Sequence, residues 1–259
     1  MKVLIFDTAE RAAECVAQQV IAQVQGKADS VLGLATGGTM LPIYELLVSA
    51  NKNKQVSFSQ ASSFNLDEYV GLNPDHPCSY HKFMRDIFFS KTDFDVARAH
   101  LPHGNTGDPE AESEDYENLV LGAGGIDLQL LGIGENGHIG FNEPTSSFRS
   151  LTRIKTLTKS TIDANRRFFE APAEPPKYAI TMGIETILRG KMIAVLATGK
   201  NKSGAVATMV EGAMGAYCPA TALQLHRHTT VVLDQAAASE LKMRDYYFQV
   251  HPDGKDALV

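Results

Sequence analysis

Short apolar runs recur along the whole chain, separated by segments with helical periodicity. The segment with Ala12, Val16, Val20 and Val24, for example, places one apolar residue per turn on a helix face. Strands that alternate with helices in this way predict an α/β fold, with a mostly parallel, doubly wound, Rossmann-like sheet and helices on both of its faces. The runs that fit buried strands occupy residues 2–6, 30–35, 61–66, 126–133, 178–181, 191–197 and 229–233.

These runs extend from residue 2 to residue 233 without a long linker, so we expect residues 1–259 to form a single domain, with residues 249–259 as a polar, mobile tail. Patterns that fit less clearly indicate a strand within residues 150–158 and a helix over residues 235–241. A hydrophobic content of 44% and a charged content of 21% are ordinary for a soluble globular protein.

Composition excludes several classes of partner. No stretch approaches the ~20 apolar residues of a membrane span, and a net charge of −6 argues against a nucleic-acid partner. The three cysteines, Cys15, Cys78 and Cys218, lie far apart and form neither a metal motif nor a disulfide framework. Together with an N-terminus that lacks a signal-peptide layout, they favour a reducing cytoplasm.

One strand ends in a turn that is unusually rich in glycine. The apolar residues 128–133 lead directly into Gly134, Gly137 and Gly140, a spacing that neither a strand nor a helix continues. In an open α/β sheet, ligands bind beyond the carboxyl ends of the strands. The turn carries four polar side chains at this place: Glu135, Asn136, His138 and Glu143.

His138 and Glu143 suit proton transfer. A histidine titrates near neutral pH, and a carboxylate five residues further along the chain can orient its ring. A surface loop with incidental charges is the alternative, but the density of glycines and ionisable groups favours a catalytic turn.

Three other turns follow predicted strands. Thr36, Gly37, Gly38 and Thr39 stand between a strand and a helix, where exposed N–H groups and the helix dipole attract an anion such as a phosphate. The turn at residues 67–69 adds two carboxylates, and the turn at residues 200–202 adds two lysines. These turns could also be purely structural, with Asp67 as a helix cap or turn residue. Taken together, they favour proton transfer on a small phosphorylated molecule.

Some familiar cofactor motifs are missing. The chain has no Cys/His cluster of a zinc site and no Walker-type phosphate loop. Gly132, Gly134 and Gly137 match a dinucleotide fingerprint by letters, but Gly132 falls within the predicted strand and no helical pattern follows Gly137.

In the turns that follow its predicted strands, the chain resembles the glucosamine-6-phosphate deaminase family, whose members are also called glucosamine-6-phosphate isomerases. The resemblance extends over nearly the whole chain. Its most specific segments are Phe-Asn-Leu-Asp-Glu-Tyr at residues 64–69 and Gly-His-Ile-Gly-Phe-Asn-Glu-Pro at residues 137–144. Further matching segments cover residues 34–39, 147–158, 165–169, 176–179 and 202–212.

The resemblance implies conversion of glucosamine 6-phosphate and water to fructose 6-phosphate and ammonia, without a metal or organic cofactor. By position, His138 would open the sugar ring with the help of Glu143, and Asp67 would move a proton between C2 and C1. The positions that would hold the sugar phosphate are Thr36, Gly37, Gly38, Thr39, Arg167 and Lys202.

One position departs from many relatives. Asn136 stands where they carry aspartate, and other relatives share the asparagine. An amide can orient the imidazole but cannot stabilise its cation as a carboxylate does, so charge support would fall on Glu143.

Some relatives are hexamers activated by N-acetylglucosamine 6-phosphate at a subunit interface. The residues here that match positions of that site are Ser146, Arg153, Lys155 and Thr156. The C-terminal part of the chain is less similar to these relatives. The sequence therefore leaves open whether the protein is a monomer or a hexamer.

Two rival functions follow from related folds. One is a 6-phosphogluconolactonase, against which the segments at residues 67–69 and 142–144 argue. The other is a sugar-phosphate sensor without catalytic activity; such sensors carry an added helix-turn-helix segment, and none precedes residues 1–6.

Overall fold

The computed structural model of the chain describes residues 1–166, 169 and 174–254. A seven-stranded sheet runs through its centre in the order β1-β10-β9-β6-β2-β3-β5, and all neighbouring strands in it are parallel. The predicted mostly parallel, doubly wound α/β sheet is thereby confirmed. Its strands are β1 (Lys2–Phe6), β2 (Val31–Leu34), β3 (Ser62–Asn65), β5 (Ala99–His100), β6 (Leu128–Leu131), β9 (Met192–Ala197) and β10 (Thr229–Asp234).

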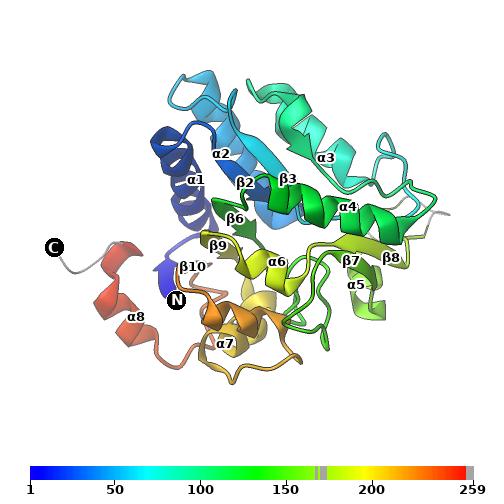
Figure 1. Cartoon of the computed structure of the whole chain (residues 1–259). Helices are drawn as coiled ribbons and strands as arrows, with labels where there is room; N and C mark the ends of the chain where they lie inside the picture. The colour runs from blue at the N-terminus through cyan, green and yellow to red at the C-terminus, as the bar shows by residue number, and fades with distance from the viewer. Residues whose placement is uncertain (167–168, 170–173, 255–259) are drawn as a thin grey trace.

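Helices cover both faces of this sheet (Figure 1). Helices α1 (Ala9–Gly26), α2 (Leu41–Lys52) and α3 (Tyr80–Ile87) lie on connections that lead toward the β5 edge. Helices α4 (Pro109–Gly122), α6 (Ile184–Leu188) and α7 (Ser203–Glu211) lie on connections that lead back toward β1. Because such crossovers are right-handed, the two groups cover opposite faces.

Helix α1 shows how the local sequence fixes an element. The hydroxyl of Thr8 accepts a 3.3 Å hydrogen bond from the backbone N–H of Arg11 and so caps the first turn. The apolar stripe from Ala12 to Val24 is buried against the sheet, as its spacing predicted.

A second, smaller sheet stands beside the first. Strand β8 (Tyr178–Thr181) pairs antiparallel with β4 (Asp67–Tyr69) on one side and with β7 (Arg153–Thr156) on the other. The sequence predicted strands within residues 150–158 and at 178–181, but residues 67–69 were expected to be a turn, which is wrong. All three residues of β4 are buried, so its short, polar sequence lacks the alternation by which a strand is recognised.

The C-terminal region also differs from the prediction. Residues 235–240 form turns rather than a helix. The carboxylate of Asp234, just before them, accepts the N–H groups of both Ala237 and Gly199. Helix α8 (Arg244–Val250) and the 3-10 turn η7 (Pro252–Gly254) then pack against β1, where a mobile tail from residue 249 was expected. Residues 255–259 of that expected tail lie outside the described residues.

The strand order creates a crevice at the carboxyl ends of two central strands, β2 and β6. Strands β2 and β6 are neighbours, but the chain leaves β2 toward β3 and leaves β6 toward β9. The loops at residues 36–39 and 132–143 therefore diverge from the carboxyl ends of adjacent strands. Such a switch point is where ligands bind in open α/β sheets. None of the helices that the structure describes is long and apolar enough to cross a bilayer.

Candidate active site

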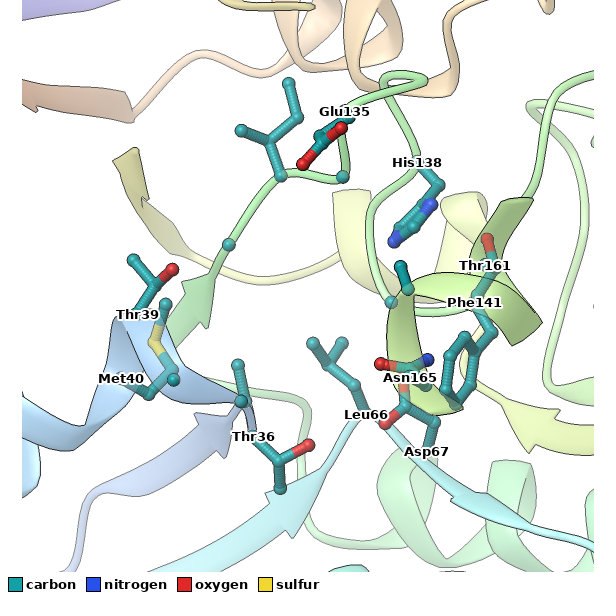
Figure 2. Close-up of a pocket in the computed structure, with 18 of the residues that line it drawn as sticks. Thr36, Thr39, Met40, Leu66, Asp67, Glu135, His138, Phe141, Thr161 and Asn165 are labelled. Atoms are coloured by element: carbon teal, nitrogen blue, oxygen red, sulfur yellow. The ribbon is translucent and has the colours of Figure 1, made fainter. Parts of the chain in front are cut away.

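A cavity of about 960 Å³ opens at this switch point. In the view of Figure 2, Thr36 and Thr39 lie on one side of it and Asp67 and His138 on the other. The structure thus brings together four segments that the sequence singled out separately. Polar or aromatic residues of the wall include Thr36, Thr39, Asp67, Tyr80, Glu135, Asn136, His138, Phe141, Thr161, Asn165, Asn201 and Lys202.

The turn after β2 has the geometry of an anion cradle. Gly37 has a φ of 103°, a left-handed conformation that favours glycine. The 3-10 turn η1 (Gly38–Met40) then leads directly into α2, and Thr36, Gly37, Gly38 and Thr39 all line the cavity. The N–H groups at this helix start and the helix dipole both favour a negatively charged group.

The carboxyl group of Asp67 faces the cavity from β4. Its residue is only 6% exposed, and burial, reinforced by the neighbouring charge of Glu68, raises its pKa to about 8. A hydrogen bond from the backbone of Phe141 acts in the opposite direction. Asp67 is therefore a stronger base than an ordinary aspartate once it is ionised.

The imidazole of His138 stands over Gly134. A Cβ at Gly134 would overlap the ring, so the close approach requires glycine at this position. The turn is held by the N–H of Gly134, which donates a 2.9 Å hydrogen bond to the carbonyl of His138. Gly137 adopts a φ of 81° in the same turn, and a Cβ there would overlap the sulfur of Cys218. The glycine spacing in the sequence thus reflects both backbone conformation and lack of space.

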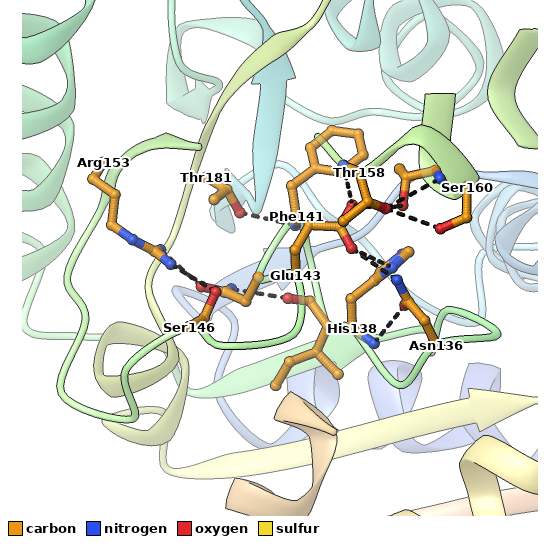
Figure 3. Close-up of polar contacts among 12 residues, drawn as sticks. Asn136, His138, Phe141, Glu143, Ser146, Arg153, Thr158, Ser160 and Thr181 are labelled. Carbon is orange, nitrogen blue, oxygen red and sulfur yellow. Dashed lines mark hydrogen bonds and ion pairs between the residues drawn. The ribbon is translucent and has the colours of Figure 1, made fainter. Parts of the chain in front are cut away.

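Glu143 contacts His138, Asn136 and Thr158 (Figure 3). Its Oε2 lies 3.7 Å from Nδ1 of His138, which has no hydrogen-bond partner among the described residues. Its Oε1 accepts hydrogen bonds from the N–H of Thr158 at 3.2 Å and from the hydroxyl of Thr158 at 3.1 Å. Burial opposes the charge of Glu143, but His138, Thr161 and Asn136 outweigh it and lower the pKa to about 2. The carboxylate is thus ionised at neutral pH.

Asn136 is hydrogen-bonded to Glu143 and to the backbone of His138. Its Nδ2 donates a 2.8 Å hydrogen bond to Oε2 of Glu143, and its Oδ1 accepts a 3.2 Å hydrogen bond from the backbone N–H of His138. The amide thus holds the carboxylate and the turn, whereas the sequence suggested that it orients the imidazole ring.

The lysines of the fourth turn lie in the 3-10 turn η5 (Lys200–Lys202), after Gly199 with a φ of 90°. Lys202 lines the cavity, whereas Nζ of Lys200 donates to the hydroxyl of Ser239 at 2.8 Å. Asn201 donates a 2.6 Å hydrogen bond to Glu135, which ties this turn to the turn after β6. Arg167, the other predicted phosphate ligand, lies outside the described residues.

The four residues matched to an allosteric site do not line the cavity. The guanidinium of Arg153 donates to Oδ1 of Asn142 at 2.7 Å and to the hydroxyl of Ser146 at 3.3 Å (Figure 3). Lys155 and Thr156 follow on the same strand, β7.

The sequence did not single out several residues of the wall. Tyr80 lines the cavity and stacks on Phe141 at a centroid distance of 6.1 Å. Thr158 caps helix α5 (Lys159–Asn165), which brings Thr161 to the cavity. A threonine before a helix is a cap signal, but only the fold shows that this cap also holds Glu143.

No group of three or more histidine, cysteine or acidic side chains among the described residues could hold a metal ion. The cavity wall itself offers a base, a histidine–carboxylate pair, a lysine and a helix start. This combination suits acid–base chemistry on an anionic small molecule.

Comparison with known proteins agrees with this geometry. Residues 6–232 match the model of a family described as glucosamine-6-phosphate isomerases/6-phosphogluconolactonase. A glucosamine-6-phosphate deaminase of Shewanella halifaxensis is 51% identical over 259 residues, which is 100% of this chain and 98% of that protein. A glucosamine-6-phosphate deaminase of Rhodopirellula baltica is 52% identical over 235 residues, 91% of this chain and 94% of that protein.

Among solved structures, this chain is more similar in sequence to a deaminase than to a 6-phosphogluconolactonase. A monomeric glucosamine-6-phosphate deaminase is 46% identical, with a TM-score of 0.90 over 92% of this chain and 99% of that chain. A 6-phosphogluconolactonase of Trypanosoma brucei shares the fold, with a TM-score of 0.73 over 93% of this chain and 98% of that chain, but is only 17% identical. The chain belongs to the glucosamine-6-phosphate deaminase family.

Proposed function

We propose that this protein converts glucosamine 6-phosphate and water to fructose 6-phosphate and ammonia. The observation that carries the proposal is one cavity in which the buried carboxyl of Asp67, the His138–Glu143 pair and the turn before α2 converge. The full-length similarity to proteins named glucosamine-6-phosphate deaminase supports the same reaction.

Ring opening comes first. His138 takes the proton of the O1 hydroxyl and returns a proton to the ring oxygen, which gives the open-chain aldehyde. Glu143, ionised and 3.7 Å from Nδ1, stabilises the imidazolium that forms on the way. Because Asn136 and Thr158 already hold Glu143 in place, the carboxylate does not need to reorganise during this step.

Isomerisation and deamination follow. Asp67 removes the proton at C2 while O1 gains a proton, which gives an enolamine. Return of the proton to C1 produces the imine at C2, to which water adds before ammonia leaves. A carboxyl whose pKa is raised by burial suits this role because the C2 proton is weakly acidic and needs a strong base.

The phosphate group would occupy the turn formed by Thr36, Gly37, Gly38 and Thr39, with Lys202 beside it and Arg167 as a further ligand. The left-handed Gly37 and the cavity-facing position of Lys202 support this assignment. A phosphate held at one end of the open chain keeps C1 and C2 in register with Asp67.

A coupled assay tests the proposal directly. Purified protein is mixed with glucosamine 6-phosphate, and fructose 6-phosphate and ammonia are measured separately. Equal yields of both products are expected, with no hydrolysis of 6-phosphogluconolactone above background. Lactone hydrolysis without ammonia release would instead establish the lactonase, and binding of sugar phosphate without turnover would establish the sensor.

The same assay tests regulation. Ser146, Arg153, Lys155 and Thr156 are proposed as the residues that receive N-acetylglucosamine 6-phosphate in an activated oligomer, a reading supported by the Arg153–Ser146 contact. Rates with and without this compound, together with the molar mass from light scattering, distinguish an activated hexamer from a monomer that does not respond.

A further inference from the structure

The neighbour of the proposed base is a second buried carboxyl. Glu68 is 1% exposed and follows Asp67 on β4, yet it is not among the residues that line the cavity. The mechanism above leaves this side chain without a role. A fully buried glutamate that does not face the substrate is costly, so the contacts that hold it are informative.

Glu68 fastens two elements together. Its Oε1 accepts the backbone N–H groups of Tyr69 at 2.8 Å and of Tyr80 at 3.1 Å, and its Oε2 accepts the backbone N–H of His81 at 3.0 Å. Tyr80 and His81 form the first turn of α3, where a carboxylate also interacts favourably with the helix dipole. The glutamate therefore joins β4, which carries Asp67, to the helix that carries Tyr80.

Tyr80 is part of the cavity wall. Its ring stacks on Phe141, and its hydroxyl lies 3.4 Å from that of Tyr69. The loop at Gly104 closes the other side of Glu68, because a Cβ at that position would overlap the carbonyl oxygen of Tyr69 and lie 3.0 Å from the Cγ of Glu68. Glu68 thus has little freedom to move, and neither do the elements that it joins.

We propose that Glu68 is a positioning residue for the reaction: it holds Asp67 and the cavity wall at Tyr80 in register by fastening β4 to the first turn of α3. This inference rests on the proposed function, in which Asp67 is the base.

The charge of Glu68 has a second consequence. It is the second cause, after burial, of the raised pKa of Asp67, and burial raises the pKa of Glu68 itself to about 7. The phenols of Tyr69, Tyr80 and Tyr116 interact electrostatically with Asp67. His81 contacts Glu68 through its backbone N–H, and its ring Nε2 lies 3.1 Å from the carbonyl oxygen of Pro102. Burial lowers the pKa of His81 and raises those of the phenols, so above a pH of about 7 Glu68 is the charged neighbour of Asp67.

The test compares Glu68→Gln and Glu68→Asp in pH profiles of kcat and kcat/KM. Glutamine keeps the shape of the side chain but removes its charge. It also places an NH2 group, which cannot accept a hydrogen bond, against the backbone N–H of His81. We expect kcat to fall on the order of 10- to 100-fold. The acid limb of kcat/KM should move to lower pH by up to about one unit, because Asp67 loses a neighbouring negative charge. The substrate titrates identically with every variant, so the difference belongs to the protein.

Glu68→Asp separates position from charge. It keeps the charge but shortens the side chain, so kcat should fall while the acid limb stays within a few tenths of a unit of the unsubstituted protein. If Glu68→Gln does not fold, the Glu68→Asp variant alone tests the inference, and an unchanged kcat in that variant would overturn it.

A matched control is Glu117→Gln. Glu117 is also buried and accepts hydrogen bonds from Thr152 and Thr186, away from the cavity. It should lower stability without moving the acid limb. The inference fails if Glu117→Gln moves the limb as much as Glu68→Gln does, or if Glu68→Gln leaves both kcat and the limb unchanged while the unsubstituted protein turns over. Absence of turnover by the unsubstituted protein would overturn the proposed function itself, and this inference with it.

Discussion

Nδ2 of Asn136 donates a 2.8 Å hydrogen bond to Oε2 of Glu143, the same oxygen that lies 3.7 Å from Nδ1 of His138. The amide therefore acts on the imidazole through the carboxylate. An aspartate at this position would place an acceptor against an acceptor, with no proton between them unless one is taken up.

Asn136→Asp should therefore shift the pH dependence of the reaction upward. The added negative charge favours the protonated imidazole over the neutral form that acts as the base, so ring opening requires a higher pH than in the unsubstituted protein. The acid limb of the ring-opening rate, measured in single-turnover experiments with the closed-ring substrate, should move up by as much as about one unit. Asn136→Ala, which removes the hydrogen bond without adding a charge, is the control. An identical profile for Asn136→Asp and the unsubstituted protein would contradict this coupling.

His138→Gln separates ring opening from the later steps. We expect it to slow the closed-ring substrate by about 10² to 10⁴, the usual range for loss of a general acid–base group. An open-chain analogue, which does not need ring opening, should lose much less. The two rates are compared in single-turnover experiments. Equal losses on both compounds would make His138 a binding or structural residue.

Asp67→Asn should lose activity and gain stability. Removal of the base should lower kcat by about 10² to 10⁴ while substrate binding is largely kept. The folded-state pKa of Asp67 is raised from 3.8 to about 8. As the pH rises from about 4 to 8, the unfolded chain therefore ionises this group while the folded protein keeps it neutral, and stability falls. The asparagine avoids that loss and should therefore be more stable than the unsubstituted protein at pH 7.5.

Urea unfolding at pH 4 and pH 7.5 measures this difference for both proteins. The gain should be present at pH 7.5 and absent at pH 4. A variant that keeps more than about a tenth of kcat would show that Asp67 is not the base.

Lys202→Ala should mainly raise KM. Loss of one charge-assisted contact to the phosphate costs about 1.5–3 kcal/mol, or roughly 10- to 150-fold in affinity. Arg167→Ala should behave in the same way. Lys200→Ala is the matched control, because Lys200 lies in the same turn but contacts Ser239 and Glu240 instead of the cavity. Unchanged KM in both Lys202→Ala and Arg167→Ala would move the phosphate site elsewhere.

Gly134→Ala should impair ring opening without unfolding the protein. The new Cβ would overlap the imidazole of His138 and push it away from Glu143. A displacement of about 1 Å can cost on the order of 10² in rate. Gly26→Ala places its Cβ in open space at the end of α1 and should leave kcat unchanged. A Gly134→Ala variant with full kcat would show that the ring position is not critical.

Local sequence predicted much of the fold because the central strands are apolar runs and the helices carry periodic stripes. Residues 193–197 of the run at 191–197 and the stripe from Ala12 to Val24 are buried, as their patterns require. Residues 235–240 were expected to form a helix and form turns instead. The carboxylate of Asp234, just before them, binds the N–H of Gly199, far away in the chain, as well as that of Ala237.

The sequence by itself determined which chemical groups this protein carries and at which strand ends they stand. Glycine spacing, the Thr36–Thr39 turn and the ionisable residues of the turn after residue 133 were sufficient to indicate proton transfer on a small phosphorylated molecule, and the family resemblance implied that this molecule is a sugar phosphate. Only the tertiary structure decided how these groups act on one another. The short strand β4 is assembled by pairing with β8, more than 100 residues away in the chain, and this pairing buries Asp67 and Glu68 side by side. Burial and neighbouring charge, which set the basicity of Asp67 and the ionised state of Glu143, are properties of the folded environment and have no local sequence signal.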